Sequence, residues 1–380
     1  MPKPRYLFVG AGFSGAVLAR ELVTRMECEA VVIDSRPHIG GNCHTERDPT
    51  TGVMLHVYGP HIFNTSNERV WAYVQQFGVF RPFINRVKAS TSRGVFSMPI
   101  NLHTINQFFG KRFNPVEARA FVAGLGDQSI EEPQNFQEQA LKFLGRDLYQ
   151  TFFYGYTRKQ WGCEPTELPA SILKRLPVRF NYDDNYYNQK FQGIPEDGYT
   201  AIIARILDHP AIEVRLNTAF RRGDAEQFDH VFYTGPIDAF FDFSEGRLGY
   251  RTVNFERIDA EGDYQGNPVI NYPDMEVPWT RVHEHKHFAP WETHERTVAF
   301  RETSKETAPD DVPYYPKRLA ADREILLRYR AMAEAQPGVS FLGRLATYRY
   351  MDMEAVIGEA LEFADAFQRT TLRSASDSEG

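Results

Sequence analysis

The chain has 380 residues, of which 42% are hydrophobic, 14% aromatic and 24% charged. At about 100–200 residues per domain, this length accommodates two or three structural units, and the apolar fraction is too high for a disordered chain. Lys and Arg number 43 against 50 Asp and Glu, which gives a net charge of -7. No basic excess is available to neutralise a polyphosphate backbone, which argues against general nucleic-acid binding.

The three cysteines, Cys28, Cys43 and Cys163, lie far apart and form no CxxC pair. Their odd number and wide spacing disfavour a disulfide scaffold and a structural zinc site, and indicate a reducing compartment. The most apolar early stretch, residues 6–19, is interrupted by glycines and is shorter than the ~20 residues of a membrane span. It also lacks the cleavage pattern of a signal peptide. We expect a cytoplasmic protein with no membrane partner.

The beginning of the chain predicts a strand, a helix and a second strand. Residues 5–10 form a short apolar run that ends at a glycine, which is typical of a buried parallel strand. Residues 14–26 have apolar side chains at helical spacing. A second apolar run, residues 30–33, ends at Asp34. This order predicts a βαβ unit, and with it an α/β fold built on a parallel sheet.

The pattern changes twice further along the chain. Residues 101–170 carry helical periodicity with few strand signals, which predicts a mostly helical insertion. Residues 243–303 contain alternating segments that predict antiparallel strands. Residues 339–343 are typical of another buried strand, and a final helix is expected to begin near Asp352. We expect the polar residues 374–380 to be disordered.

The sharpest local signal is the glycine motif of Gly10, Gly12 and Gly15, between the first strand and the first helix. Glycines at this spacing allow a tight turn and let a pyrophosphate approach the helix N-terminus, where free N–H groups favour anions. Asp34 follows at the end of the second strand, where an acidic side chain accepts hydrogen bonds from ribose hydroxyls. A glycine-rich turn without a ligand is the alternative. The strand–turn–helix context favours a dinucleotide site.

Three further stretches favour FAD as that dinucleotide. Arg36 is followed by the run Gly40-Gly41-Asn42, a continuation that is typical of FAD proteins. Residues 231–236 resemble the returning strand of a two-part flavin-binding domain, and Gly343-Arg344 resembles a contact with the flavin diphosphate. Each stretch alone is compatible with a turn that has only a structural role. Together, three separated stretches that return to one site favour FAD.

Aromatic and cationic side chains are mixed in residues 152–161 and 171–187. Tyr and Trp offer faces to a nucleobase, and Arg binds a diphosphate through two parallel hydrogen bonds. Aromatic residues are more often part of a core or an interface, but their mixture with cations in an acidic protein favours a nucleotide-sugar site. The cationic members are Arg158, Lys159, Arg175 and Arg179.

Three histidines, His283, His285 and His287, alternate along residues 281–288 and would share one face of a strand. Three imidazoles are able to bind zinc. No clear fourth ligand or activated carboxylate lies nearby, so we expect a polar strand face and no metal. The sequence also lacks a GxSxG motif, which gives no support for a hydrolase triad.

With these features in place, the sequence resembles the bacterial UDP-galactopyranose mutase family over nearly its whole length. The resemblance consists of many short sequence blocks in the same order, which together are more specific than any single motif. The matching blocks are RPHIGGNC (36–43), YGPHIFNTS (58–66), GYTRKQWG (155–162), LPASILKRLPVRF (168–180), FQGIPEDGYT (191–200), YTGPID (233–238), NPVINYPD (267–274), TRVHEHKHF (280–288), PYYP (313–316) and GRLATYRYMDM (343–353).

The resemblance implies a discontinuous Rossmann-like FAD-binding domain, an inserted helical bundle and a six-stranded antiparallel sheet. The FAD-binding domain would comprise residues 1–80, 196–242 and 316–380, and the helical domain residues 102–170. The sheet domain, which carries substrate contacts, would comprise residues 81–101, 171–195 and 243–315.

The resemblance also implies a reaction. Members of this family interconvert UDP-galactopyranose and UDP-galactofuranose, a precursor for cell-surface polysaccharides. Reduced FAD attacks the anomeric carbon through N5 and forms a covalent adduct while UDP leaves, with no net redox change. The implied partners are a UDP-galactose substrate, a reductant of unknown identity and, as in many members, a second copy of the chain.

Site residues are implied by matching positions. Arg175, Arg281 and His61 match the catalytic positions. The two arginines would stabilise the negative charge that builds on the leaving diphosphate. For His61 the alternative is a buried structural histidine. The cofactor positions are Gly10, Gly12, Ser14, Gly15, Asp34, Arg36, Gly41, Asn42, His61, Phe220, Arg344, Asp352 and Met353. The substrate positions are Asn64, Asn85, Phe152, Tyr156, Trp161, Arg175, Tyr186, Arg251, Asn271, Arg281, Tyr315 and Tyr350.

Three positions depart from the family pattern. Asn64 stands where most members carry a second histidine, Pro60 replaces an alanine and Met351 replaces a tyrosine. These changes leave the chemistry in place but open the choice of sugar, so UDP-N-acetylgalactosamine and dTDP-fucopyranose are alternative substrates. An oxidoreductase of the flavin amine oxidase type and a flavoprotein that only binds nucleotide-sugar are the less favoured functions.

Overall fold

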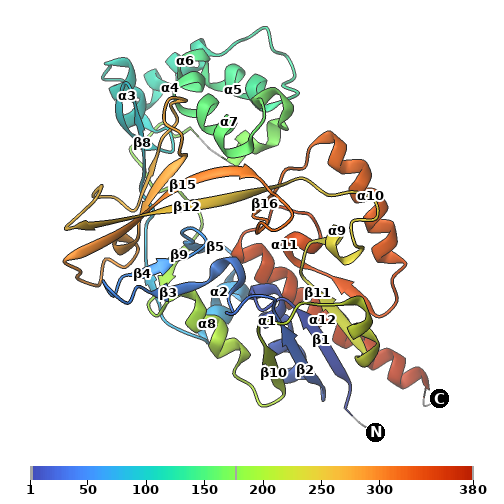
Figure 1. Cartoon of the computed structure of the whole chain (residues 1–380). Coiled ribbons are helices and arrows are strands. Elements are labelled where there is room, and N and C mark those ends of the chain that lie inside the picture. Colours follow the sequence, from blue (N-terminus) through green and yellow to red (C-terminus); the bar gives the residue numbers. More distant parts are fainter. Residues whose placement is uncertain (1–2, 176–177, 379–380) are drawn as a thin grey trace.

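Five parallel strands form the first sheet, in the order β10-β2-β1-β11-β17 (Figure 1). The computed structural model describes the backbone of residues 3–175 and 178–378, and their side chains except those of residues 174, 175, 320 and 372–378. The predicted βαβ unit is confirmed, because β1 pairs with β2 in parallel through helix α1 (Phe13–Arg25). The strands are β1 (Arg5–Val9), β2 (Glu29–Ile33), β10 (Ile212–Arg215), β11 (His230–Tyr233) and β17 (Val339–Phe341).

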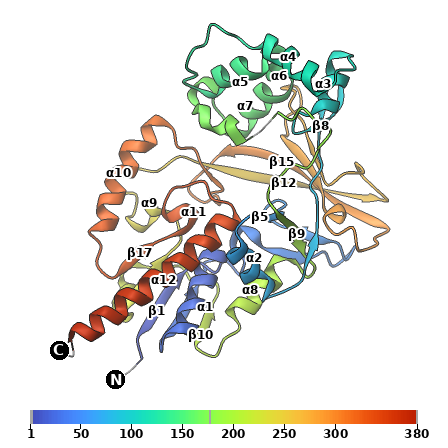
Figure 2. The same ribbon diagram turned by 180° about the vertical axis from the view of Figure 1, so that it is seen from behind.

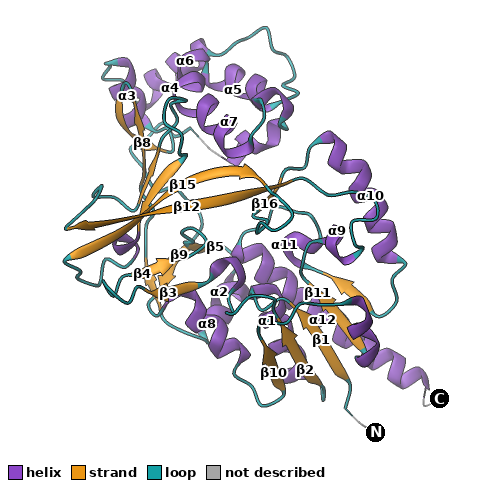
Figure 3. Cartoon of the chain, in the orientation of Figure 1, coloured by secondary structure: helices purple, strands orange, loops and turns teal. Residues whose placement is uncertain are grey.

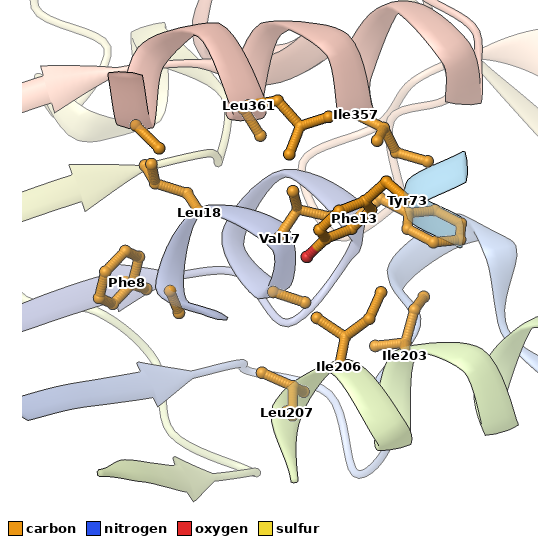
Figure 4. Close-up of a cluster of buried hydrophobic side chains, with 14 of the residues drawn as sticks. Phe8, Phe13, Val17, Leu18, Tyr73, Ile203, Ile206, Leu207, Ile357 and Leu361 are labelled. Carbon is orange, nitrogen blue, oxygen red and sulfur yellow. The ribbon is translucent and has the colours of Figure 1, made fainter. Parts of the chain in front are cut away.

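Helix α1 is buried on almost every side, because residues 13–19 carry no charged side chain. Figure 4 shows it between α12 (Met353–Ser378), whose Ile357 faces it, and α8 (Gly198–Leu207), whose Ile203 lies on the opposite side. Seen from behind, α1, α8 and α12 cover one face of the parallel sheet (Figure 2). This core fixes the start of α1 and, with it, the glycine turn that precedes the helix.

A second sheet crosses the middle of the molecule in Figure 1, and the described residues give it seven strands in the order β16-β12-β15-β14-β13-β7-β8. The expectation of six antiparallel strands was wrong in two details. The two-residue β16 adds a strand, and β13 pairs with β7 in parallel. The chain between β7 and β13 is long enough to permit a parallel pairing, which a short hairpin cannot make. The strands are β7 (Val87–Thr91), β8 (Gly94–Met98), β12 (Tyr250–Glu261), β13 (Val269–Asn271), β14 (Arg281–Glu284), β15 (Arg296–Glu306) and β16 (Tyr315–Pro316).

Helices gather at one end of the second sheet, where the helical insertion was predicted (Figure 3). Local sequence explains their starts, because the side chains of Asn101, Asn114 and Asn135 each accept a hydrogen bond from a backbone N–H of the first turn. The elements are α3 (Leu102–Phe109), α4 (Pro115–Leu125), α5 (Phe136–Leu144), α6 (Arg146–Tyr149), the π-helical turn η2 (Gln150–Tyr154), α7 (Gly155–Trp161), and the 3-10 turns η3 (Pro165–Glu167) and η4 (Ala170–Arg175).

The end of the chain differs from the expectation of a disordered tail. Residues 374–378 continue α12, and neither proline nor glycine interrupts the sequence from residue 359 to residue 378. No helix in the described ranges is both long and apolar enough to cross a membrane. The remaining elements are β3 (Thr45–Arg47), β4 (Met54–His56), β5 (Phe63–Thr65), β6 (Phe80–Pro82), β9 (Phe191–Pro195), α2 (Glu68–Gln75), α9 (Ile237–Phe240), α10 (Ala320–Glu334), α11 (Gly343–Ala346), and the 3-10 turns η1 (Gly41–Cys43), η5 (Arg222–Gln227) and η6 (His285–Phe288).

Candidate active site

A cavity of about 790 Å³ opens at the carboxyl ends of β1, β2 and β11. Strand β1 is followed in sequence by β2 on one side, whereas its other neighbour, β11, comes much later in the chain. Open α/β sheets bind ligands at such a reversal of strand order. Segments 218–222, 310–313 and 351–353 complete the walls, so the cavity is assembled from distant parts of the chain.

The glycine turn shapes the floor of this cavity. Gly10 has φ +112°, and a Cβ at this position would lie 2.1 Å from Thr234 Oγ1. A Cβ on Gly15 would lie 2.0 Å from the carbonyl oxygen of Gly10, so only glycine lets α1 begin this close to β1. Gly12 and Gly41 face each other across a narrow gap, in which a Cβ on Gly41 would lie 3.4 Å from Gly12 Cα. The backbone is therefore open to a close-fitting ligand.

Asp34 and Arg36 form the second wall. Asp34 accepts backbone hydrogen bonds from Ala11 (2.9 Å) and Arg36 (3.0 Å), one on each carboxylate oxygen. Asp34 therefore braces the turn, and each oxygen keeps a second lone pair for a ligand hydroxyl. The guanidinium of Arg36 donates to Asn42 Oδ1 through Nη2, but its Nη1 is buried and has no hydrogen-bond partner among the described atoms. A buried, unpartnered cationic donor is costly unless an anion binds there.

The third wall comes from the C-terminal part of the chain. Gly343 has φ +82°, and a Cβ there would lie 2.5 Å from Ser14 Oγ, so the turn before Arg344 packs directly on the start of α1. The Arg344 guanidinium lies 5.8 Å from the ring centre of Tyr315. Arg344 therefore lines the cavity and also reaches the second sheet.

A cluster of polar side chains on the second sheet adjoins the cavity at this point. Arg281 Nε lies 2.7 Å from Glu302 Oε2, and Glu302 is only 1% exposed. Burial opposes the charge of Arg281, but Glu302 outweighs it and holds the arginine pKa above its ordinary value. The rings of Tyr315 and Tyr350 stack with centroids 6.0 Å apart. The Arg281 guanidinium in this cluster therefore stays protonated.

Tyrosine hydroxyls surround this charge. Burial raises the pKa of Tyr156, Tyr186 and Tyr315, so these hydroxyls remain protonated and able to donate hydrogen bonds. A fixed arginine with neutral hydroxyl donors is the arrangement that binds phosphate oxygens.

His61 connects the cavity to this cluster. Its Nδ1 lies 2.8 Å from the carbonyl oxygen of Gly59, so we assign the proton to Nδ1. Burial lowers the pKa of His61 to about 4, and Arg344 and Arg281 act in the same direction. The imidazole is therefore neutral near pH 7, with Nε2 as an acceptor.

Comparison with known proteins assigns a family to this arrangement. A family model described as UDP-galactopyranose mutase matches residues 151–350, and a model of an NAD(P)-binding Rossmann-like domain matches residues 9–77. A probable UDP-galactopyranose mutase of Klebsiella pneumoniae is 55% identical to this chain, over 97% of this chain and 95% of that protein. The chain belongs to the UDP-galactopyranose mutase family.

Two further proteins are similar to this chain. A dTDP-fucopyranose mutase of Escherichia coli is 51% identical, over 96% of this chain and 98% of that protein. A crystal structure of reduced UDP-galactopyranose mutase has a TM-score of 0.77 at 16% identity, covering 97% of this chain and 95% of that one. The second similarity shows the shared fold.

The predicted cofactor positions of the family converge in this chain. All of them line the cavity except Gly15, which lies behind the turn and permits its close packing. Among the substrate positions, Tyr156, Tyr186, Tyr315 and Arg281 interact electrostatically in one cluster.

Two predicted substrate positions make extensive contacts within the chain. Arg251 is 3% exposed, and its guanidinium donates to the carbonyl oxygen of Gln160, to Ser304 Oγ and to Glu306 Oε1. Its hydrogen bonds hold the C-terminal end of α7 against β15. Phe152 is 4% exposed and packs against the rings of Phe96 on β8 and Phe108 on α3. Sequence matching does not reveal these partners within the chain, and a substrate contact of either side chain remains a prediction.

The remaining substrate positions come from several elements. Asn85 is 3% exposed, its Oδ1 has no partner among the described atoms, and its backbone carbonyl accepts from Tyr186. Asn271 pairs with Arg281 across β13 and β14, and Trp161 ends α7. The Asn64 amide donates to the carbonyl oxygen of Ile62. The side chain of Arg175 lies outside the part of the chain that the structure describes.

The histidine pattern does not form the strand face that the sequence suggested. Strand β14 ends at Glu284, and His285 begins a 3-10 turn. Glu284, His287 and Asp263 approach one another, but Glu284 accepts three backbone hydrogen bonds from residues 264–266. This carboxylate shapes a loop, and the absence of a bound metal remains a prediction.

The buried His285 makes folding stability depend on pH. Burial lowers its folded-state pKa to about 3, below the ordinary 6.5. The unfolded chain therefore takes up a proton that the folded chain refuses, and this contribution to stability is complete above about pH 6.5 and lost as pH falls toward 3. At pH 5 the loss is about 2 kcal/mol.

We expect His285→Gln to reduce the fall in unfolding free energy between pH 7 and pH 5 by about 2 kcal/mol, as measured by urea denaturation. The exposed His103→Gln is the matched control. Equal pH dependence in the wild type and His285→Gln would contradict this assignment.

Glu302 is a site residue that sequence patterns did not single out. It follows Val298 and Phe300 on one face of the alternating β15. An acidic side chain directly after two apolar residues of the same strand face was the available signal, since a buried carboxylate needs a cationic partner.

Proposed function

We propose that this chain is a nucleotide-sugar mutase that interconverts UDP-galactopyranose and UDP-galactofuranose with reduced FAD as cofactor. The observation that carries the proposal is the position of the Arg281–Glu302 pair and its tyrosines beside the dinucleotide-type cavity, with Arg344 reaching both. A diphosphate held by Arg281 would place the attached sugar at the mouth of that cavity.

The residues of the cavity fit FAD. The glycine turn leaves room for a pyrophosphate, the buried Arg36 Nη1 lacks a partner, and the volume suits a large cofactor. Asp34, Arg36 and Asn42 would hold the adenosine half and Arg344 the diphosphate, with His61 near the reacting ring. Bound and reduced, the flavin would supply a nucleophile for the anomeric carbon without net electron transfer.

The chain's own residues would stabilise the departing nucleotide. Negative charge grows on the diphosphate as the bond to the sugar breaks, and Arg281 offers a fixed positive charge that needs no reorganisation. Tyr156, Tyr186 and Tyr315 would donate hydrogen bonds to the same oxygens. Arg175 remains in the proposal as the second arginine. The neutral His61 would accept a hydrogen bond through Nε2 without adding charge beside the sugar.

A second substrate is favoured by one specific observation. The dTDP-fucopyranose mutase of Escherichia coli is 51% identical to this chain, nearly as similar as the probable UDP-galactopyranose mutase of Klebsiella pneumoniae. Asn64, Pro60 and Met351 are the three positions at which this sequence departs from the family pattern. dTDP-fucose is therefore the alternative substrate for the same chemistry.

The proposal is tested by product analysis. Purified protein, chemically reduced and kept anaerobic, is incubated separately with UDP-galactofuranose and dTDP-fucofuranose, and the products are separated by anion-exchange chromatography. We expect conversion to the pyranose form of one nucleotide-sugar with reduced protein and none with oxidised protein. A flavin-loaded, reduced protein that converts neither would overturn the proposal.

A further inference from the structure

Lys159, on helix α7, has an unusual set of hydrogen bonds. Its ammonium group donates to four main-chain carbonyl oxygens of the segment 272–279, which joins β13 to β14. The acceptors are Tyr272 (2.6 Å), Asp274 (2.8 Å), Val277 (2.8 Å) and Trp279 (3.0 Å).

Four carbonyls that converge on one ammonium fix the shape of a loop. The group has three N–H donors, so the fourth acceptor shares a hydrogen, and the oxygens surround the nitrogen as they would a bound cation. Burial lowers the pKa of Lys159 to about 8, and the charges of Asp274 and Glu276 oppose the shift. The carbonyl dipoles also favour the charged form, which keeps the buried ammonium satisfied.

The loop and the helix approach each other closely at this point. A Cβ on Gly155, at the start of α7, would lie 2.2 Å from the carbonyl oxygen of Pro273. Glycine at this position therefore lets the backbone of α7 rest on the loop, within reach of Lys159. Hydrogen bonds and close packing act on the same pair of elements.

Both elements carry predicted nucleotide contacts. Asn271 and Arg281 face each other at the base of the loop, as a register pair of β13 and β14. Tyr156 and Trp161 lie on α7. The ammonium of Lys159 thus joins the element that carries the aromatic contacts to the element that carries the amide and the arginine.

We propose that Lys159 is a positioning residue for the nucleotide half of the site, which holds the 272–279 loop against α7 so that both meet the nucleotide in one geometry. This inference rests on the proposed function, because it takes the ligand to be a nucleoside diphosphate-sugar. Lys159 itself contacts the loop and not the substrate.

The test compares Lys159→Met with the wild type, using UDP and dTDP as binding probes. We expect the dissociation constant of the preferred nucleotide and the KM of the nucleotide-sugar to rise roughly 10- to 100-fold, the effect of losing charge-assisted hydrogen bonds. We expect kcat to stay within about threefold of the wild-type value, and the flavin-to-protein ratio to stay unchanged. The matched control is Lys142→Met, which removes an ammonium that donates to one carbonyl oxygen, that of Glu131, in the helical domain.

Two further variants separate positioning from general instability. Gly155→Ala pushes the loop from α7 without touching the lysine, and should raise KM in the same way. Lys159→Ala should regain nucleotide affinity with added propylammonium but not with propanol, because the cation alone restores the donors. Unchanged affinity in Lys159→Met and Gly155→Ala, or equal loss of flavin and kcat, overturns the inference. A wild type that binds neither nucleotide overturns the proposed function together with it.

Discussion

Replacing Arg281 by glutamine is expected to lower kcat of the reduced protein by roughly 10²- to 10³-fold, the usual cost of removing one group that stabilises developing charge. The guanidinium interacts with the hydroxyls of Tyr156, Tyr186 and Tyr315, and Glu302 holds it charged at any working pH. The loss should appear in kcat, because the charge on the diphosphate grows as the sugar bond breaks. Steady-state kinetics with the reduced protein measures it.

The effect of Arg281→Gln on the buried partner Glu302 needs a control. Glu302 is 1% exposed, so Arg281→Gln alone removes the guanidinium from a buried carboxylate and leaves it with Thr280 Oγ1 and the imidazole of His283, which destabilises the fold. The double variant Arg281→Gln with Glu302→Gln removes both charges, and should regain thermal stability while kcat stays low. Arg296→Ala, which breaks an exposed ion pair with Glu261, should change neither property. Recovery of kcat in the double variant would contradict a catalytic role for Arg281.

The second large effect is expected from Gly15→Ala. The added methyl group would lie 2.0 Å from the carbonyl oxygen of Gly10, a backbone atom that cannot move without displacing β1. Helix α1 must shift away from the sheet, which disrupts the turn under the cavity and costs roughly 1–3 kcal/mol of stability through overpacking. We expect the variant to be purified without flavin, as measured by the ratio of visible to ultraviolet absorbance.

Gly124→Ala on α4 provides the matched control. Gly124 is also a helical glycine, but no atom lies within 4 Å of its added Cβ. This variant should keep its flavin and gain about 0.5–1 kcal/mol of stability, because alanine is the better helix former. Full flavin occupancy in Gly15→Ala would show that the close approach is not required.

Local patterns predicted much of the fold, because the information they need lies within a few residues. The glycine spacing and the buried runs around Asp34 identify the βαβ unit, and helical periodicity marks the helical insertion. Strand pairing across the second sheet depends on contacts between distant segments, so the parallel β13–β7 pair and the short β16 were not predictable.

The site was predictable to the extent that chemistry follows residue type. The cofactor positions form one cavity, because the glycine turn and the strand ends that follow it have a fixed geometry. Arg251 shows the limit: the family resemblance implies a substrate contact, but the sequence does not reveal that its hydrogen-bond partners Gln160, Ser304 and Glu306 come from two other elements. Lys159 shows the converse, since its acceptors are backbone carbonyls that no side-chain pattern encodes.

Counting turnovers per reduced flavin tests the central claim most directly. The protein is reduced with one equivalent of dithionite without oxygen, excess reductant is removed, and UDP-galactofuranose or dTDP-fucofuranose is added in large excess. A mutase converts many substrate molecules per flavin, and the visible spectrum remains that of the reduced form throughout. Product that stops at one equivalent while the flavin returns to its oxidised spectrum would contradict the account and indicate an oxidoreductase.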